Sequence, residues 1–168
     1  MTGAQHLRRR LAGVLLAAAL VGAGALAGST AGARGERLRT LTLKELEKGQ
    51  TFTHIRNTKT ASPRANSQGD ALTFTNPLAD ASGKVVGTLH AACTTTTGAA
   101  NFVRSTITCA GALVLRNGTL TLQIVTSPGA ATSTGAVTGG TGAYANARGV
   151  IVSTLTQGGS NDTITLAG

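Results

Sequence analysis

Apolar and polar residues alternate in short runs from residue 51 to the end of the chain. The runs are rich in Thr, Val, Ile and Leu, and Gly, Pro, Asn or Asp separate them, as is typical of β-strands joined by turns. No apolar positions after residue 50 recur at helical spacing. The pattern therefore predicts strands at 51–60, 70–77, 84–96, 102–115, 119–125, 134–138, 149–156 and 162–167.

Strands of this number and length predict an all-β domain, and we expect an eight-stranded antiparallel β-barrel. Closing the sheet removes its exposed edges, and a small barrel can enclose one small ligand. The turn residues support antiparallel neighbours, because the pair Asn117-Gly118 lies between two apolar runs and is a strong hairpin signal. Further turns are expected at 79–83, 97–101 and 158–161.

The segment 39–48 fits two different structures. Thr42 and Glu45 have the spacing of a helix capping box. The same segment also alternates as a strand does, with Leu41, Leu43 and Glu45 on one face. Over so short a window, periodicity does not decide between helix and strand.

The first 33 residues have the order of a secretory signal peptide. Three arginines at 8–10 precede a run of Leu, Ala, Val and Gly, and small-residue cleavage sites follow it. An uncleaved anchor is the alternative, but the run is short for a membrane span. We therefore expect a signal peptide at 1–33, a basic segment that can hold a first strand at 34–50, and the barrel at 51–168. The product would be secreted, with no membrane span after cleavage.

The 168-residue chain has a formal charge of +9, but only 2% of its residues are aromatic. Most basic residues outside the signal peptide lie before residue 67, so the charge is not spread over the barrel. Single-stranded nucleic acid stacks on aromatic side chains. Phe52, Phe74, Phe102 and Tyr144 are the only Phe, Tyr or Trp residues, and the composition therefore argues against a nucleic-acid partner.

Cys93 and Cys109 are the only cysteines. A hairpin that turns at 97–101 places them close together, on the apolar faces of two neighbouring strands. In a secreted chain such a pair is expected to form a disulfide. The alternative is a zinc site that includes His90, although His90 lies on the opposite face of its strand and no fourth ligand is evident. We expect no metal and no other cofactor.

Two segments resemble a known superfamily. Residues 69–80 (GDALTFTNPLAD) resemble the G-D-x-x-x-F-T-N-x-L-x-D segment of allene oxide cyclases. Residues 139–149 (GGTGAYANARG) resemble the G-G-T-G-x-F/Y-x-x-A-R-G segment of dirigent proteins. The resemblance covers nearly the whole chain after the signal peptide. It implies an eight-stranded barrel around a hydrophobic cavity, usually in a homotrimer, and it favours a strand at 39–48.

The resemblance to allene oxide cyclases also implies functional residues. Glu45 matches the glutamate of that family's first strand, and Asn76 matches the Asn of its F-T-N segment. These two are the expected catalytic residues. Phe74 shares a strand face with Asn76, and Cys93 matches a cavity cysteine, so both are expected to line the ligand pocket.

Tyr144 and Arg148 carry over from the dirigent segment as further pocket residues.

Allene oxide cyclases close a fatty-acid epoxide into a cyclopentenone, so an enzyme of this kind would be an isomerase. The resemblance thus implies a secreted barrel that binds a small hydrophobic ligand, with cyclase or isomerase activity. The alternative is a non-catalytic extracellular barrel filled by its own side chains, and the interior volume distinguishes the two.

Overall fold

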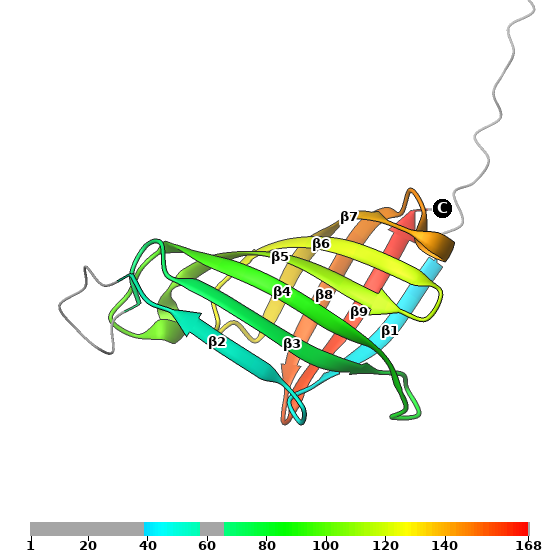
Figure 1. The fold of residues 1–168 in the computed structure, drawn as a ribbon, viewed down its shortest axis with the longest axis horizontal. Coiled ribbons are helices and arrows are strands. Elements are labelled where there is room, and N and C mark those ends of the chain that lie inside the picture. Colours follow the sequence, from blue (N-terminus) through cyan, green and yellow to red (C-terminus); the bar gives the residue numbers. More distant parts are fainter. Residues whose placement is uncertain (1–38, 58–65, 168) are drawn as a thin grey trace, which may run out of the picture. The chain divides into compact units, whose positions relative to one another are not determined.

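The computed structural model describes residues 39–57 and 66–167, so the expected signal peptide lies outside the described residues. The described part is built almost entirely of strands (Figure 1). The strands are β1 (Arg39–Leu46), β2 (Thr51–Ile55), β3 (Ala71–Ala79), β4 (Val85–Thr97), β5 (Thr106–Leu115), β6 (Gly118–Thr126), β7 (Thr132–Gly140), β8 (Arg148–Thr156) and β9 (Gly159–Ala167). Two single-turn 3-10 helices, η1 (Phe102–Arg104) and η2 (Gly142–Tyr144), complete it. None of the described helices could cross a membrane.

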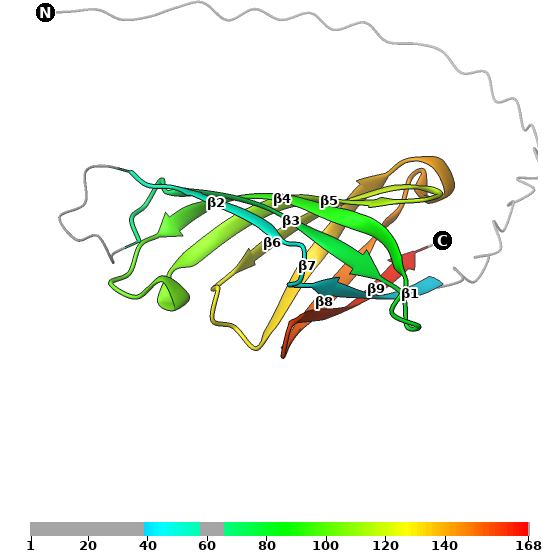
Figure 2. The same ribbon diagram turned by 60° about the horizontal axis from the view of Figure 1, so that its bottom comes forward.

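Neighbouring strands pair antiparallel in the order β1-β9-β8-β7-β6-β5-β4-β3-β2, and β1 also pairs with β3. The second pairing closes an eight-stranded barrel, as the sequence predicted, and β2 extends the sheet along the other half of β3. Figure 2 shows β2–β5 on one side and β8, β9 and β1 on the other. Closure therefore depends on 39–46, which is a strand and not a capped helix.

A break separates β1 from β2 along their shared neighbour β3. β1 leaves β3 at Leu78, and β2 joins it at Thr75, so Pro77 lies opposite the break. Pro has no N–H to give to a ladder, and it is tolerated where the neighbouring strand is interrupted. Gly49 turns the chain within the break at φ 89°, a conformation that favours glycine.

The interior is packed at one end of the barrel and hollow at the other. The fully buried apolar side chains come from alternate positions of the strands, and the largest are Leu72, Leu78, Leu113, Leu120, Ile151 and Ile164. Tyr144 and Ala147 pack against the same core from the loop between β7 and β8. Burial of this apolar surface, worth about 25 cal/mol per Å², is the main force that holds the strands together.

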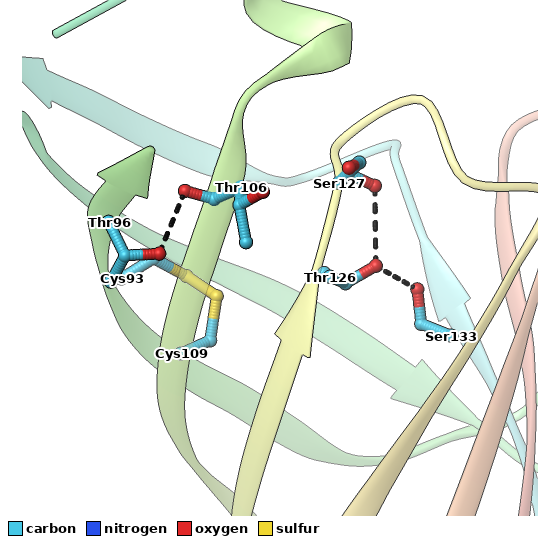
Figure 3. The surroundings of a disulfide bond; sticks show 7 residues. All are labelled: Cys93, Thr96, Thr106, Cys109, Thr126, Ser127 and Ser133. Atoms are coloured by element: carbon cyan, nitrogen blue, oxygen red, sulfur yellow. Dashed lines mark hydrogen bonds between the residues drawn. A yellow bond between two sulfur atoms is a disulfide. The ribbon is translucent and has the colours of Figure 1, made fainter. Parts of the chain in front are cut away.

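The predicted disulfide between Cys93 and Cys109 is present (Figure 3). The two cysteines are direct partners on β4 and β5, with their Cα atoms 4.0 Å apart. A cross-link that closes a loop of this length stabilises the fold by about 3 kcal/mol in the chain-entropy model. The zinc alternative is wrong, because both sulfur atoms are used in the disulfide and His90 is exposed on the outer face of β4.

Candidate functional site

The hollow end of the barrel contains a cavity of about 440 Å³. This volume lies within the range of small-molecule sites, about 300–1,000 Å³. Most of its wall is apolar. Most of these apolar residues come from β3 to β6, and they include Leu72, Phe74, Leu89, Ala91, Ile107, Leu122 and Ile124. The interior is therefore not filled by its own side chains, contrary to what the alternative of a barrel packed with its own residues assumed.

Small inward-facing residues leave room for the cavity. Ala91 on β4 and Gly111 on β5 are cross-strand partners, and both line the cavity. A Cβ atom added to Gly111 would lie 3.4 Å from Leu89 Cδ1 and from the His90 carbonyl oxygen. The wall therefore lacks bulk at positions where larger side chains would fill the barrel. Glu47 and Gln50, in the break between β1 and β2, also line the cavity.

Glu45 and Asn76, the two expected catalytic residues, meet in this cavity. Glu45 points inward from β1 and Asn76 from β3, and Asn76 Nδ2 donates a hydrogen bond of 2.7 Å to Glu45 Oε2. Both residues line the cavity. The contact exists because β1 closes the barrel against β3, which brings positions 31 residues apart side by side.

Asp162 is a further member of the site that the sequence reasoning did not single out. It points inward from β9, is 0% exposed, and accepts a hydrogen bond of 3.2 Å from Ser160 Oγ at its Oδ1. The alternation along β9 carried the signal, because Asp162 shares a face with Ile164 and Leu166. A carboxyl on the apolar face of a core strand needs a partner, and here the carboxyl of Glu45 lies beside that of Asp162.

The two carboxyls share a buried site in which the pKa of each is raised. Burial raises the pKa of Glu45 to about 8, the charge of Asp162 adds to the rise, and the hydrogen bond from Asn76 opposes it. Burial also raises the pKa of Asp162, whereas hydrogen bonds from Ser153, Glu45 and Ser160 lower it. Asp162 Oδ2 is buried with no donor among the described residues unless Glu45 supplies one. We therefore assign the proton to Glu45.

Glu45 is the member of the pair that reaches the cavity. Glu45 lines the cavity wall, whereas Asp162 lies behind it and does not. A carboxylic acid that is neutral at pH 7 and faces an apolar pocket can give a proton to a bound molecule. Asp162, which lies behind Glu45, supplies a second carboxyl that can accept a proton when Glu45 loses or regains its own.

Phe74 lines the cavity, as expected. Cys93 is 3% exposed, and its disulfide partner Cys109 is the cysteine that lines the wall. Phe102 in η1, which the sequence reasoning did not include, is a further aromatic residue of the wall. The disulfide therefore forms part of the wall through the cysteine that the family resemblance did not point to.

Tyr144 and Arg148 are not among the residues that line the cavity. Tyr144 is buried in the core at the packed end, where Arg39 lies over its ring at 5.4 Å. Arg39 begins β1 and Glu45 lies six residues further along it, about 20 Å away at the rise of an extended strand. Arg148 donates from Nη1 to the carbonyl oxygen of Ala147 at 2.7 Å. Both residues hold the loop between β7 and β8, which explains the GGTGAYANARG segment without a ligand.

The described residues contain no group of three or more His, Cys, Asp or Glu side chains placed to hold a metal ion. The cavity wall offers the carboxyls of Glu45 and Glu47, the amides of Gln50 and Asn76 and several hydroxyls as its polar groups. These groups can bind and transfer protons.

No family model matches the sequence, and no curated protein matches it. Solved structures do match. A structure of pyocyanin demethylase is 25% identical, covers 77% of this chain and 100% of its own, and superposes with a TM-score of 0.63.

Two further barrels are similar in fold. The exo-specific intermolecular Diels-Alderase AbnU is 13% identical, covers 78% of this chain and 98% of its own, and has a TM-score of 0.56. A pterocarpan synthase dirigent protein is 14% identical, covers 78% and 88%, and also has a TM-score of 0.56. The dirigent-like and cyclase-like barrel fold is thus confirmed, and the allene oxide cyclase resemblance stays a prediction.

Proposed function

We propose that this protein binds a small, largely apolar molecule in its cavity and isomerises it by proton transfer at Glu45. The observation that carries the proposal is the pair of neighbouring buried carboxyls, Glu45 and Asp162, of which Glu45 lies in the wall of an apolar cavity. In an isomerisation the acid gives a proton to one atom of the substrate, and the pair takes a proton back from another. The reaction balances without an oxidant, a reductant or a cofactor.

The similar structures support a small-molecule cavity. The solved barrels bear the names of a pyocyanin demethylase and of Diels-Alderases, whose reactions involve small cyclic molecules. We further propose that the protein acts outside the cytoplasm, because a disulfide persists in an oxidising compartment.

Ligand binding in the cavity is tested with pyocyanin as the probe, followed by its visible absorbance. Ala91→Leu puts bulk into the cavity and should weaken binding at least tenfold. Ala92→Leu makes the same change one residue further on, on the exposed outer face of β4, and should leave binding unchanged. Equal affinity in both variants would place the binding site outside the cavity.

Proton transfer is tested with a bicyclic β,γ-unsaturated ketone, whose conversion to the α,β-isomer is followed by ultraviolet absorbance. Glu45→Gln keeps the size of the side chain and removes its acid, so we expect a loss of about 100-fold or more. The wild-type rate should fall above about pH 8, where Glu45 loses its proton. A wild-type rate no higher than that of Glu45→Gln would contradict the catalytic half of the proposal and leave cavity binding standing.

A further inference from the structure

A row of hydroxyl side chains crosses the cavity wall next to the carboxyl pair. Ser133 on β7 is the cross-strand partner of Ser153 on β8, and Ser153 is the partner of Asp162 on β9. Thr126, at the end of β6, lies 2.6 Å from Ser133 between the two hydroxyl oxygens (Figure 3). Thr126, Ser133 and Ser153 all line the cavity, and we call these three residues the hydroxyl row.

The hydrogens of the hydroxyl row already have acceptors inside the protein. Ser153 is the cross-strand partner of Asp162, and its hydroxyl lowers the pKa of that carboxyl, so its hydrogen is directed toward the carboxylate. Thr126 Oγ1 lies 3.3 Å from the carbonyl oxygen of Ser127, which can only accept, and 2.6 Å from Ser133 Oγ, where either hydroxyl can donate. A chain from Ser133 to Thr126 to Ser127 therefore gives both hydrogens an acceptor inside the protein. A hydroxyl oxygen that has given away its hydrogen can still accept. The row therefore presents acceptors to the cavity.

We propose that the cavity selects molecules that carry O–H or N–H groups along one edge of an otherwise apolar ring system. The ring would lie against the apolar wall from β3 to β6, and its donors would meet the hydroxyl row. Phenols, enols and aromatic amines have this chemistry, whereas ethers and esters without such hydrogens do not. The inference rests on the proposed function in one respect, because it takes the cavity as the binding site.

The test compares the affinities of 2,3-dihydroxynaphthalene and 2,3-dimethoxynaphthalene by calorimetry. The two molecules share a ring system and differ in the two hydrogens. We expect the diol to bind at least tenfold more tightly. Ser133→Ala should weaken binding of the diol about three- to tenfold, the range of one lost hydrogen bond, and leave binding of the dimethyl ether unchanged. Thr134→Ala removes a neighbouring hydroxyl from the exposed face of β7 and should affect neither.

Each outcome has one meaning. Equal affinity for the two molecules would overturn the selection of donors and leave cavity binding intact. A Ser133→Ala variant that loses affinity for both equally would show that Ser133 acts only by fastening β6 to β7. Failure of both molecules to bind, with pyocyanin also failing, would overturn the proposed function together with this inference.

Discussion

Asp70 and Asp162 are both buried aspartates of the same barrel, yet their surroundings have opposite effects. Asp70 is 1% exposed and Asp162 is 0% exposed. Burial raises the pKa of Asp70, but hydrogen bonds from Asn57 N, Ser67 N and His54 lower it by more, so the net pKa is below its usual value. Burial raises the pKa of Asp162, and its hydroxyl donors do not reverse the rise.

The number and kind of donors separate the two sites. Asp70 Oδ1 accepts from Asn57 N at 2.6 Å, and Oδ2 accepts from Ser67 N at 3.1 Å and from His54 Nε2 at 3.2 Å. These donors anchor both chain segments that flank residues 58–65. Asp162 instead shares its surroundings with a second carboxyl. The donors around Asp70 favour its charged form, whereas the carboxyl of Asp162 favours the protonated form of its neighbour Glu45.

The largest expected effect comes from making the same substitution at both aspartates. Asp70→Asn should destabilise the fold by about 3 kcal/mol, because an amide nitrogen cannot accept from the backbone N–H groups and the charge is lost. Asp162→Asn should be nearly neutral or stabilising, because it removes the cost of keeping a buried carboxylate away from water. Urea unfolding of the two variants at pH 7 measures both values, and a similar loss at the two sites would remove the distinction.

A smaller effect follows from the pH dependence of Glu45. Its pKa is about 8 in the folded state against 4.5 ordinarily, so the folded state holds the extra proton between these values. Stability therefore falls as pH rises from about 4.5 to 8. Glu45→Gln should remove this slope and raise the melting temperature above pH 8, with each kcal/mol gained worth about 4 °C. Melting curves from pH 4 to 9 give the slope, and identical curves for the two proteins would contradict the raised pKa.

Asp70 predicts the opposite pH response. Its pKa is lowered below the ordinary 3.8, so its stabilising effect is complete above about pH 4 and is lost as pH falls through the folded pKa. Wild type should lose stability steeply on acidification below pH 4. The Asp70→Asn variant should lose less over the same interval, as measured by urea unfolding at pH 2.5 to 4.5.

The smallest effect is expected at His54. Its side chain is 22% exposed and forms one of the donors to Asp70. Because the two backbone donors remain, His54→Gln should cost about 1 kcal/mol or less. A loss as large as that of Asp70→Asn would show that His54, and not the backbone, anchors the loop.

The sequence by itself determined most of the strands, the turn at Asn117-Gly118 and the disulfide. These features depend on short-range rules: a period of two along each strand, a turn of fixed chemistry, and a hairpin that brings Cys93 to Cys109. The same rules placed Asn76 and Phe74 on one strand face, whereas the strand that carries Glu45 was favoured only by the family resemblance. The predicted strand at 102–115 was wrong at its start, because Phe102–Arg104 form a 3-10 helix and the strand begins at Thr106. The expected homotrimer and secretion remain predictions.

Only the tertiary structure decided what the inward faces of the strands meet. Asp162 and Glu45 lie more than a hundred residues apart, and they are neighbours because β1 closes the barrel between β9 and β3. Tyr144 and Arg148 lie in a segment that resembles a functional motif, yet Tyr144 packs in the filled end and Arg148 is exposed and bonds to the carbonyl oxygen of Ala147. Alternation tells which side chains point inward, but the register across the closing strand sets the level at which each one lies. That level places the protonated Glu45 in the wall of the cavity and Tyr144 in the packed core.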